Sequence, residues 1–517
     1  MKKEVNKKYL VFPVNNFASR KSLKFSLNGQ TVYSLNINLD NINPDFYAYV
    51  DVSRFMGEEL EISVSPEMDI KFRESDTMDI DGLYQETYRP QIHFSTKNGW
   101  LNDPNGLLYL DGIYHMFYQY NPCSTEHVNM HWGHATSPDL IHWEEKDIAL
   151  FPDETGEMFS GSAMTDWNNV TGLGKDGIPA SLLFYTATNP HMQYMAYSTD
   201  GFKTIQKRKE HIVPNMSRIN RDPKVMYSEE MEAYIMALYL ENDTYALLVS
   251  DDLTNWNHIQ SFTLAGDKEC PDIFPITDNE GNRKWVILGA RSRYLVGEMK
   301  KDVGFVQIQE VLPLHFGDSA YAGQSYAGLP EGRIIRVDWV CSKIITPRFK
   351  SQMSIPAELK LENINGIYYL SANPVHELSV IYDQNALWEN VSISGGSLKK
   401  IELECKPYNF KIKADDLDSG AVVAIRIFGR ELLIKCEENC LRFGKHTLPL
   451  SILGKGLDLN VIVDKLSFEV YLDGGKVYGS FLNNNSVCDY NVPYLEIASN
   501  KDILINSIES HTLRSIW

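Results

Sequence analysis

Residues 246–256 read ALLVSDDLTNW, and two earlier stretches share this layout: MAYSTDGFKTI at 195–205 and GHATSPDLIHW at 133–143. Each combines an apolar strand with a serine, an aspartate-containing turn and a closing hydrophobic or aromatic residue. Apolar runs of a second kind lie at 181–188 (SLLFYTAT), 232–240 (EAYIMALYL) and 284–291 (KWVILGAR). A recurrence of roughly fifty to sixty residues suits a four-stranded blade, so the region predicts a β-propeller. Chance recurrence within a large β-sandwich is the alternative.

Both flanks of this region are rich in strands but lack the repeat. Before it, Tyr33, Leu35, Ile37 and Leu39 alternate with polar residues, as in a half-buried strand. After it, runs such as AVVAIRIFG (421–429) and closely spaced turns suggest a β-sandwich. Helical periodicity is almost absent, which makes the class all-β. We expect an N-terminal β-rich accessory domain at 1–85, a propeller catalytic domain at 86–345 and a C-terminal β-sandwich at 346–517.

The composition narrows the classes of partner. The 517-residue chain has 43% hydrophobic and 23% charged residues, which is typical of globular proteins, and a net charge of −19. Such a charge repels phosphate backbones and anionic lipids, so nucleic acids and membranes are poor candidates. A neutral polar ligand such as a sugar fits better, although the charge could equally serve solubility alone. The sequence leaves a homo-oligomer possible.

Cysteine usage and the first residues bear on the compartment. Seven cysteines without regular spacing do not describe a disulfide framework, and we expect mostly buried thiols in a reducing compartment. Cys436 and Cys440 lack the second pair that a metal site needs. The apolar patch at 9–14 is too short for a signal sequence and contains Pro13. We therefore expect a cytoplasmic protein, although a chain trimmed of its signal would look the same.

Asp103 is the first of three acidic residues in settings that suit glycosidic cleavage. That chemistry needs one carboxylic acid to protonate the leaving oxygen and one carboxylate acting from the opposite face. Asp103 lies in WLNDPNG (100–106), whose turn chemistry would project its carboxylate at the start of a strand. A simple turn is the alternative. Trp100 and the following FYQYNP (117–122) favour a sugar site, since aromatic faces and amides recognise sugar rings and hydroxyls.

Asp222 and Glu269 are the other two. Arg221 adjoins Asp222, and its positive charge is expected to keep that carboxylate ionised. Glu269 precedes Cys270 and Pro271, and such apolar neighbours are expected to raise its pKa, as a general acid requires. A turn aspartate with a solvated arginine, and an exposed loop glutamate beside Lys268, are the alternatives.

The ordered set of motifs carries a family resemblance. WLNDPNG, FYQYNP, HWGHATSPDLIHW, FSGS (159–162), RDP (221–223) and ECPD (269–272) occur in the order seen in glycoside hydrolase family 32, and the chain resembles that family from about His93 onward. The resemblance implies a five-bladed propeller with a funnel-shaped pocket, followed by a β-sandwich. SQMSIPAELKL (351–361) looks like the segment that joins the two.

The resemblance also implies roles for individual residues. Asp103 would be the nucleophile, Asp222 the transition-state stabiliser and Glu269 the acid/base of a retaining β-fructofuranosidase. The substrate would be fructan, fructo-oligosaccharide or sucrose, and neither a metal nor another cofactor is implied. The implied working carboxyl groups would stand about 5–5.5 Å apart. The residues implied to contact substrate are Trp100, Asn102, Gln119, His127, Trp132, Phe159, Ser160 and Arg221.

Some features depart from the family pattern. His127 stands where a tryptophan is common, and Lys268 stands where an aromatic residue is common, which leaves the preferred substrate and chain length open. Residues 1–90 resemble an extra β-domain found before some fructan-degrading members, which tilts the expectation toward fructans. His131 and His134 would point to opposite faces of a strand and are expected to be structural. Asp272 is expected to bind sugar hydroxyls or to orient Arg221.

Two other functions stay open at this point. A fructosyltransferase would use the same fold but pass the fructosyl group to another sugar. A non-catalytic carbohydrate-binding protein would need no acidic triad, so the presence of all three acids disfavours it.

Overall fold

The computed structural model describes residues 1–79, 81–342, 344, 346–415, 417–436, 440–443, 446–449, 456–482 and 491–517. In these residues the regular structure is almost entirely β-strand, which confirms the predicted class. The helices among them are short 3₁₀ turns: η1 (Ser53–Phe55), η2 (Pro330–Gly332) and η3 (His376–Ile381). No helix in the described ranges combines the length and apolar character needed to cross a membrane.

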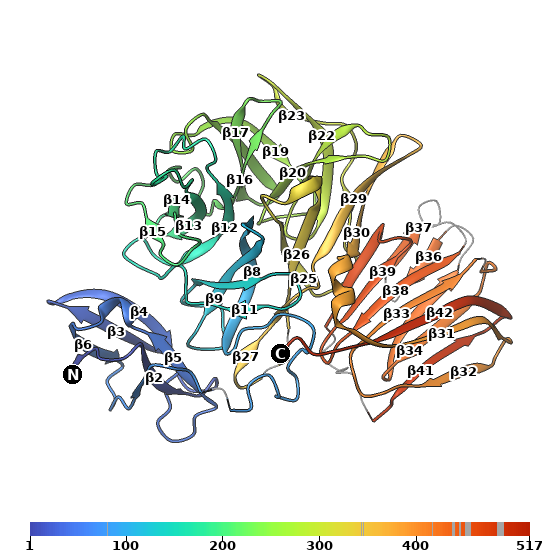
Figure 1. Ribbon diagram of the computed structural model, residues 1–517, viewed down its shortest axis with the longest axis horizontal. Helices are drawn as coiled ribbons and strands as arrows, with labels where there is room; N and C mark the ends of the chain where they lie inside the picture. Colours follow the sequence, from blue (N-terminus) through green and yellow to red (C-terminus); the bar gives the residue numbers. More distant parts are fainter. Residues whose placement is uncertain are drawn as a thin grey trace.

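The N-terminal residues form two antiparallel sheets around a shared apolar core. Figure 1 shows these strands in blue at one side of the molecule. The first sheet has the order β1 (Lys2–Glu4), β6 (Glu59–Ser65), β3 (Lys21–Leu27) and β4 (Gln30–Ile37), and the second β5 (Phe46–Asp51), β2 (Tyr9–Val14) and β7 (Arg73–Ser75). The predicted alternation is present in β4, where Tyr33, Leu35 and Ile37 are buried. β4 lies at the edge of its sheet, facing the propeller.

Five antiparallel sheets follow between Gly99 and Pro374. Their main strands are β8 (Gly99–Leu110), β9 (Ile113–Asn121), β10 (His131–Ser137) and β11 (Glu144–Glu145); β12 (Met158–Thr165), β13 (Ser181–Thr188), β14 (His191–Ser198) and β15 (Gln206–Lys207); β16 (Arg221–Ser228), β17 (Ala233–Glu241), β18 (Thr244–Ser250) and β19 (Asn257–Thr263); β20 (Asp272–Thr277), β21 (Arg283–Leu288), β22 (Arg293–Lys300) and β23 (Gly304–Gln307); and β25 (Ala320–Ser325), β26 (Ile334–Val340), β29 (Ala357–Ile364) and β30 (Ile367–Pro374). Short additions are β24 (Leu312–Pro313), β27 (Phe349–Lys350) and β28 (Gln352–Met353), of which β27 runs parallel to β8.

The first strands of these sheets surround a central axis. β8 contacts β12, β12 contacts β16, β16 contacts β20, β20 contacts β25, and β25 contacts β8. In such a closed ring the inner edge of each sheet is short and protected by its neighbours, and the starts of all first strands lie around one mouth.

The repeated sequence units occupy equivalent places in this ring. Each unit contains the end of the third strand of its sheet and the turn that follows, at β10, β14 and β18. In each turn the backbone N–H of the aspartate donates to the hydroxyl of the serine two residues earlier. The bonds run from Asp139 to Ser137 at 3.2 Å, from Asp200 to Ser198 at 3.3 Å, and from Asp252 to Ser250 at 3.2 Å. The shared Ser-x-Asp pattern is therefore a turn device of the blade, which is why it repeats.

The C-terminal residues form two six-stranded sheets that enclose an apolar core. One has the order β31 (Tyr382–Ile393), β42 (Ile503–Leu513), β33 (Tyr408–Ala414), β38 (Leu457–Val463), β39 (Phe468–Leu472) and β40 (Val477–Phe481); the other β32 (Leu398–Glu402), β41 (Tyr494–Ser499), β34 (Val422–Ile427), β35 (Arg430–Cys436), β36 (Cys440–Phe443) and β37 (His446–Pro449). The fifth sheet of the ring extends to Pro374, past the expected boundary at residue 345, because β29 returns to pair with β26.

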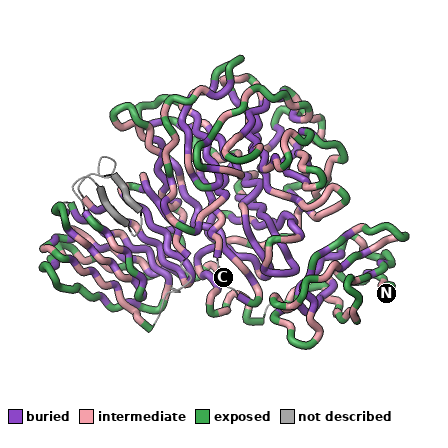
Figure 2. Tube along the Cα trace, turned by 180° about the vertical axis from the view of Figure 1, so that it is seen from behind, coloured by how far each residue is buried: buried purple, intermediate pink, exposed green. Residues whose placement is uncertain are grey.

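Buried polar side chains fasten the sandwich to the propeller. His93, just before β8, lies 2.8 Å from Asp464 and 3.2 Å from Glu469, both in the sandwich. The Tyr478 hydroxyl donates to Asp338 of β26. Figure 2 shows continuous burial across this junction. The sandwich is thus a rigid support for the ring.

Candidate active site

Local irregularities in the first strands position the side chains at the mouth of the ring. The strand register shifts between Leu101 and Pro104 in β8, between Phe159 and Gly161 in β12, between Arg221 and Lys224 in β16, and between Tyr321 and Gln324 in β25. A β-bulge turns side chains away from the regular alternation of a strand. Asp103, Ser160 and Asp222 lie within three of these bulges, and Tyr321 borders the fourth.

Unusual backbone conformations occur at the same place. Asp222, Glu269 and Cys270 have positive φ angles of 64°, 58° and 38°. Residues other than glycine rarely adopt this region, and such strain concentrates at functional sites. Gly161 allows β12 and β13 to pack closely. A Cβ at this position would lie 1.9 Å from the Phe184 carbonyl oxygen, so only glycine allows the two strands to approach.

A cavity of about 330 Å³ lies at this mouth. Its volume falls at the lower end of the range of small-molecule sites. It is lined by Asn102, Asp103, Gln119, His127, Phe159, Ser160, Arg221, Asp222, Glu269, Cys270, Tyr321 and Trp339. The structure therefore brings together all three predicted acids and six of the predicted contact residues, from segments spread between 102 and 269.

Two predicted contact residues lie elsewhere. Trp132 has 0% of its surface exposed and packs in the core between neighbouring sheets, where its indole N–H donates to the Phe159 carbonyl. It supports the cavity wall from behind, because β10 is the third strand of its sheet, two strands away from β8 at the central axis. Trp100 is also buried; it donates to Asn102 at 2.8 Å and its ring packs against His127 and Trp339.

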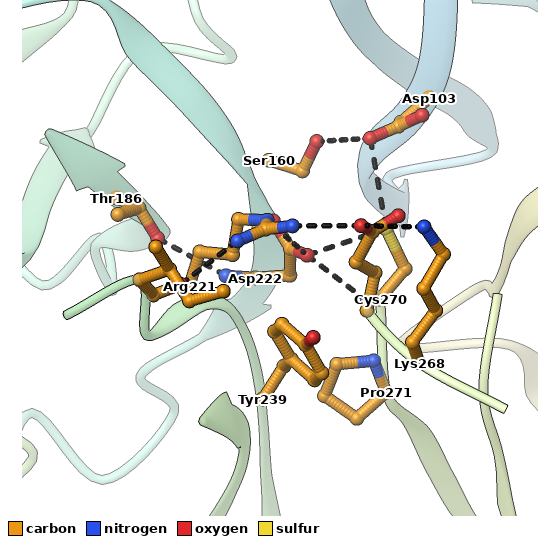
Figure 3. A network of polar contacts seen from close by, with 12 residues as sticks. Asp103, Ser160, Thr186, Arg221, Asp222, Tyr239, Lys268, Cys270 and Pro271 are labelled. Atoms are coloured by element: carbon orange, nitrogen blue, oxygen red, sulfur yellow. Dashed lines mark hydrogen bonds and ion pairs between the residues drawn. The ribbon is translucent and has the colours of Figure 1, made fainter. Parts of the chain in front are cut away.

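Asp103 has a small, ordered set of neighbours. Its Oδ2 accepts a hydrogen bond from the Ser160 hydroxyl at 2.6 Å, and the Cys270 thiol lies 3.6 Å from the same oxygen (Figure 3). Burial raises the pKa of Asp103, while the bonds from Ser160 and Asn102 partly offset this. The negative charge of Glu269 adds to the rise, so the two carboxyl groups are electrostatically coupled.

Glu269 is held by cationic and phenolic donors. The Arg221 guanidinium donates to its Oε1 at 2.7 Å, and the Lys268 ammonium lies 3.3 Å from the same oxygen. The Tyr321 hydroxyl donates to its Oε2. Burial raises the pKa of Glu269, but the bond from Tyr321 and the charges of Arg221 and Lys268 outweigh it and leave the pKa below its ordinary value.

Asp222 is the most enclosed of the three acids. Its backbone N–H donates to Thr186, and its Oδ2 accepts from the Cys270 backbone N–H at 3.0 Å. Arg221 lies 3.6 Å away through Nε. Burial raises the pKa of Asp222 to about 7, against the opposing charge of Arg221.

These pKa directions reverse the expectation from sequence. Arg221 was expected to keep Asp222 ionised, yet its terminal nitrogen bonds Glu269 more closely, at 2.7 Å against 3.6 Å. Apolar neighbours were expected to raise the pKa of Glu269, yet its side chain keeps 20% of its surface exposed and faces three donors. The neighbours in space, and not those in sequence, decide both values.

Other predicted residues have structural partners. Asp272 is fully buried and pairs with Lys224 at 2.9 Å, inside the ring, so it contacts neither the cavity nor Arg221. His131 lies 2.6 Å from the Tyr33 hydroxyl of the N-terminal domain, and His134 lies 3.0 Å from His115, so both are structural as expected. No cluster of potential metal ligands occurs in the described part of the chain.

The cysteines were predicted to be mostly buried thiols. Cys123, Cys270 and Cys436 are buried, Cys341 is half-buried and Cys405 is exposed. Cys488 and the side chain of Cys440 lie outside the described residues.

Sequence reasoning missed Tyr321 and Trp339 entirely. Both come from the fifth sheet, about fifty residues or more after ECPD, in segments without the turn motifs that mark the acids. Cys270 was noted only as an apolar neighbour of Glu269, whereas its backbone N–H and thiol lie against two of the acids. Its place within ECPD was the only available signal.

Comparisons with known proteins agree with this geometry. The family described as "Glycosyl hydrolases family 32 N-terminal domain" matches residues 93–373. A levanase of Bacillus subtilis is 30% identical over 489 residues, covering 84% of this chain and 72% of that protein. An extracellular exo-inulinase of Aspergillus niger is 32% identical over 364 residues, covering 59% of this chain and 68% of that protein.

Solved structures show the same fold. An exo-inulinase structure from Aspergillus awamori has a TM-score of 0.72 and 24% identity, covering 84% of this chain and 100% of that one. A fructofuranosidase structure from Schwanniomyces occidentalis has a TM-score of 0.73 and 22% identity, covering 85% and 100%. The β-propeller followed by a β-sandwich is therefore confirmed. The chain belongs to glycosyl hydrolase family 32.

Proposed function

We propose that this protein is a retaining β-fructofuranosidase that removes terminal fructosyl units from fructans, fructo-oligosaccharides or sucrose. One observation carries the proposal: Asp103, Asp222 and Glu269 line a single cavity of about 330 Å³. Two carboxyl groups flanking a glycosidic bond are the minimum for this chemistry. The similarity to a levanase and an exo-inulinase supports fructosyl bonds as the target.

In the first step Asp103 attacks the anomeric carbon of the terminal fructosyl unit. The bond to the leaving sugar breaks while Glu269 donates its proton to the departing oxygen, and an ester forms between Asp103 and the fructosyl group. Ser160 holds the attacking carboxylate through its 2.6 Å hydrogen bond. A fixed geometry of this kind keeps the nucleophile close to its target.

In the second step Glu269 acts as a base. It removes a proton from water, which attacks the anomeric carbon and releases fructose together with the Asp103 carboxylate. The coupling between the two carboxyl groups assists this exchange of roles. While Asp103 is ionised its charge favours protonated Glu269, and once Asp103 is esterified that charge is gone and the pKa of Glu269 falls.

The proton that Glu269 needs is acquired when substrate binds. In the substrate-free protein Arg221, Lys268 and Tyr321 stabilise the ionised form. A leaving sugar seated over Glu269 removes water from the carboxyl group and raises its pKa, as desolvation does.

Asp222 fits the stabilising role. It lies beside both Cys270 and Arg221 at the base of the site and carries a pKa of about 7. In its ionised form it accepts hydrogen bonds from sugar hydroxyls and stabilises the positive charge that develops on the ring. Gln119, Asn102 and His127 supply further polar contacts on the wall.

Conservative replacement of the two working acids tests the proposal. Asp103→Asn and Glu269→Gln are expected to lower kcat on sucrose by about 10²-fold or more, since general acid–base catalysis alone contributes 10²–10⁴-fold. Asp252→Asn, which changes the same chemical group in an outer turn, is the matched control. Circular dichroism and thermal melting confirm folding. Activity within a fewfold of wild type in either acid variant contradicts the assignment.

Product analysis defines the reaction more closely. Initial rates on sucrose, a short inulin oligomer and levan compare the linkages and chain lengths accepted. Free fructose as the main product at high sucrose is the expected result. Long oligomers in its place would identify a transferase that uses the same covalent intermediate.

A further inference from the structure

A second hollow, of about 770 Å³, lies between the N-terminal domain and the propeller. One wall is the edge strand β4, and the other is the segment 152–157 before β12. Its polar lining includes Gln30, Ser34 and Asn36 from β4, and Asp153, Glu154 and Glu157 from the propeller. Amides, hydroxyls and carboxylates are the groups that bind sugar hydroxyls.

The charge of this hollow restricts the ligand. Its described lining contains three carboxylates and neither lysine nor arginine. An anionic ligand would be repelled, whereas a neutral polyhydroxyl chain finds acceptors and donors along both walls.

The hollow and the catalytic cavity share one loop, residues 123–130. His127 lines the cavity, and Asn129 lines the hollow. The Asn129 side chain pairs with the backbone of Asn36 like an added strand: its Oδ1 accepts from the Asn36 N–H and its Nδ2 donates to the Asn36 carbonyl, both at 2.7 Å. Its own backbone N–H donates to Glu157 at 2.6 Å.

The N-terminal domain holds this loop at further points. The Thr125 hydroxyl donates to Asn16 at 2.9 Å, and Arg20 pairs with Glu126 at 2.5 Å. The loop is therefore fixed between the two domains, and His127 with it.

The hollow lies beside the mouth of the cavity. Glu157 lines the hollow and Phe159, two residues later, lines the cavity. Two residues of extended chain span about 7 Å, so the two spaces lie close together along this segment.

We propose that this hollow is a distal subsite for the fructan chain, built jointly by the N-terminal domain and the propeller. The inference rests on the proposed fructosidase function and assigns the N-terminal domain a part in it. A chain whose terminal unit occupies the catalytic cavity extends past His127 and lies against β4. Sucrose is too short to reach the hollow, so the subsite favours longer substrates.

Filling the hollow tests the proposal. Ser34 is exposed on β4, and Ser34→Tyr places a ring in the space. Ser63→Tyr is the matched control: Ser34 pairs with Lys24, and Lys24 pairs with Ser63, so Ser63 lies in register on the same sheet two strands away and outside the hollow. Glu154→Arg provides a second variant on the opposite wall.

The measurement is kcat/KM on a long inulin and on sucrose for each protein. Ser34→Tyr and Glu154→Arg are expected to lower the inulin value about fivefold to tenfold, as for the loss of about one net hydrogen bond to the chain. Their sucrose values, and both values of Ser63→Tyr, should stay within twofold of wild type.

The alternatives are distinguishable. Unchanged inulin values in both hollow variants, or equal losses on inulin and sucrose, would overturn the subsite. A wild-type protein inactive on both substrates would instead overturn the proposed function.

Discussion

Tyr321→Phe should shift the pH dependence of catalysis without removing an acid. The phenolic hydroxyl of Tyr321 donates to Glu269 Oε2, and this bond stabilises the ionised form of the carboxyl group. Hydrogen bonds to charged groups contribute about 1.5–3 kcal/mol net. Losing the bond removes this preference for the ionised form, so the pKa of Glu269 should rise.

The direction of the effect follows from the role of Glu269. As the general acid it must be protonated, so activity is lost on the alkaline side when it ionises. Because Glu269 takes up its proton when substrate binds, the alkaline limb of kcat reports this group, and a raised pKa moves that limb to higher pH. Arg221 and Lys268 remain in place and still favour the ionised form of Glu269, which limits the rise in its pKa.

The assay is kcat for saturating sucrose across the pH range, with wild type and Tyr239→Phe measured alongside. Tyr239 packs against Arg221, 4.9 Å from the guanidinium to the ring centre, but its hydroxyl faces the Asn242 carbonyl. Its phenylalanine variant should keep the wild-type limb. An alkaline limb of Tyr321→Phe that stays at the wild-type position, or moves to lower pH, would refute the reasoning.

Two further predictions concern the scaffold. Burial lowers the pKa of His93, but Asp464 and Glu469 outweigh it and raise the pKa to about 9. The contribution of protonated His93 to the stability of the fold is therefore complete below the unfolded pKa of about 6.5. It is lost as pH rises through about 9. His93→Gln should therefore cost on the order of 3 kcal/mol in urea unfolding at about pH 6 and distinctly less at about pH 10; an equal cost at both would contradict the ion pairing. Gly161→Ala forces a Cβ against the Phe184 carbonyl and should lower stability by about 1–3 kcal/mol while displacing Ser160 from Asp103. Thermal melting and sucrose turnover should fall together, and wild-type values for both would show that the strands can separate freely.

The acids could be predicted because each stands in a short segment with its own chemical signature. Asp103 and Asp222 precede prolines and Glu269 precedes Cys-Pro, and all three sequence segments begin or adjoin the first strand of a sheet. The repeated Ser-x-Asp turns likewise predicted a propeller because the same local hydrogen bond recurs in three of the five sheets.

Properties that depend on distant neighbours could not be predicted. The order of the pKa values follows from how Arg221 divides its nitrogens between two carboxylates, which no linear spacing reveals. Tyr321 reaches Glu269 from the neighbouring sheet, about fifty residues later in the sequence. Trp132 has the aromatic character of a sugar platform, yet its strand position buries it in the core.

Rapid acid quenching during sucrose turnover, followed by peptide mass mapping, tests the central claim most directly. The account predicts one fructosyl unit attached to the peptide that contains Asp103, and none on that peptide in Asp103→Asn. A fructosyl adduct on the peptide containing Asp222 or Glu269 would contradict it.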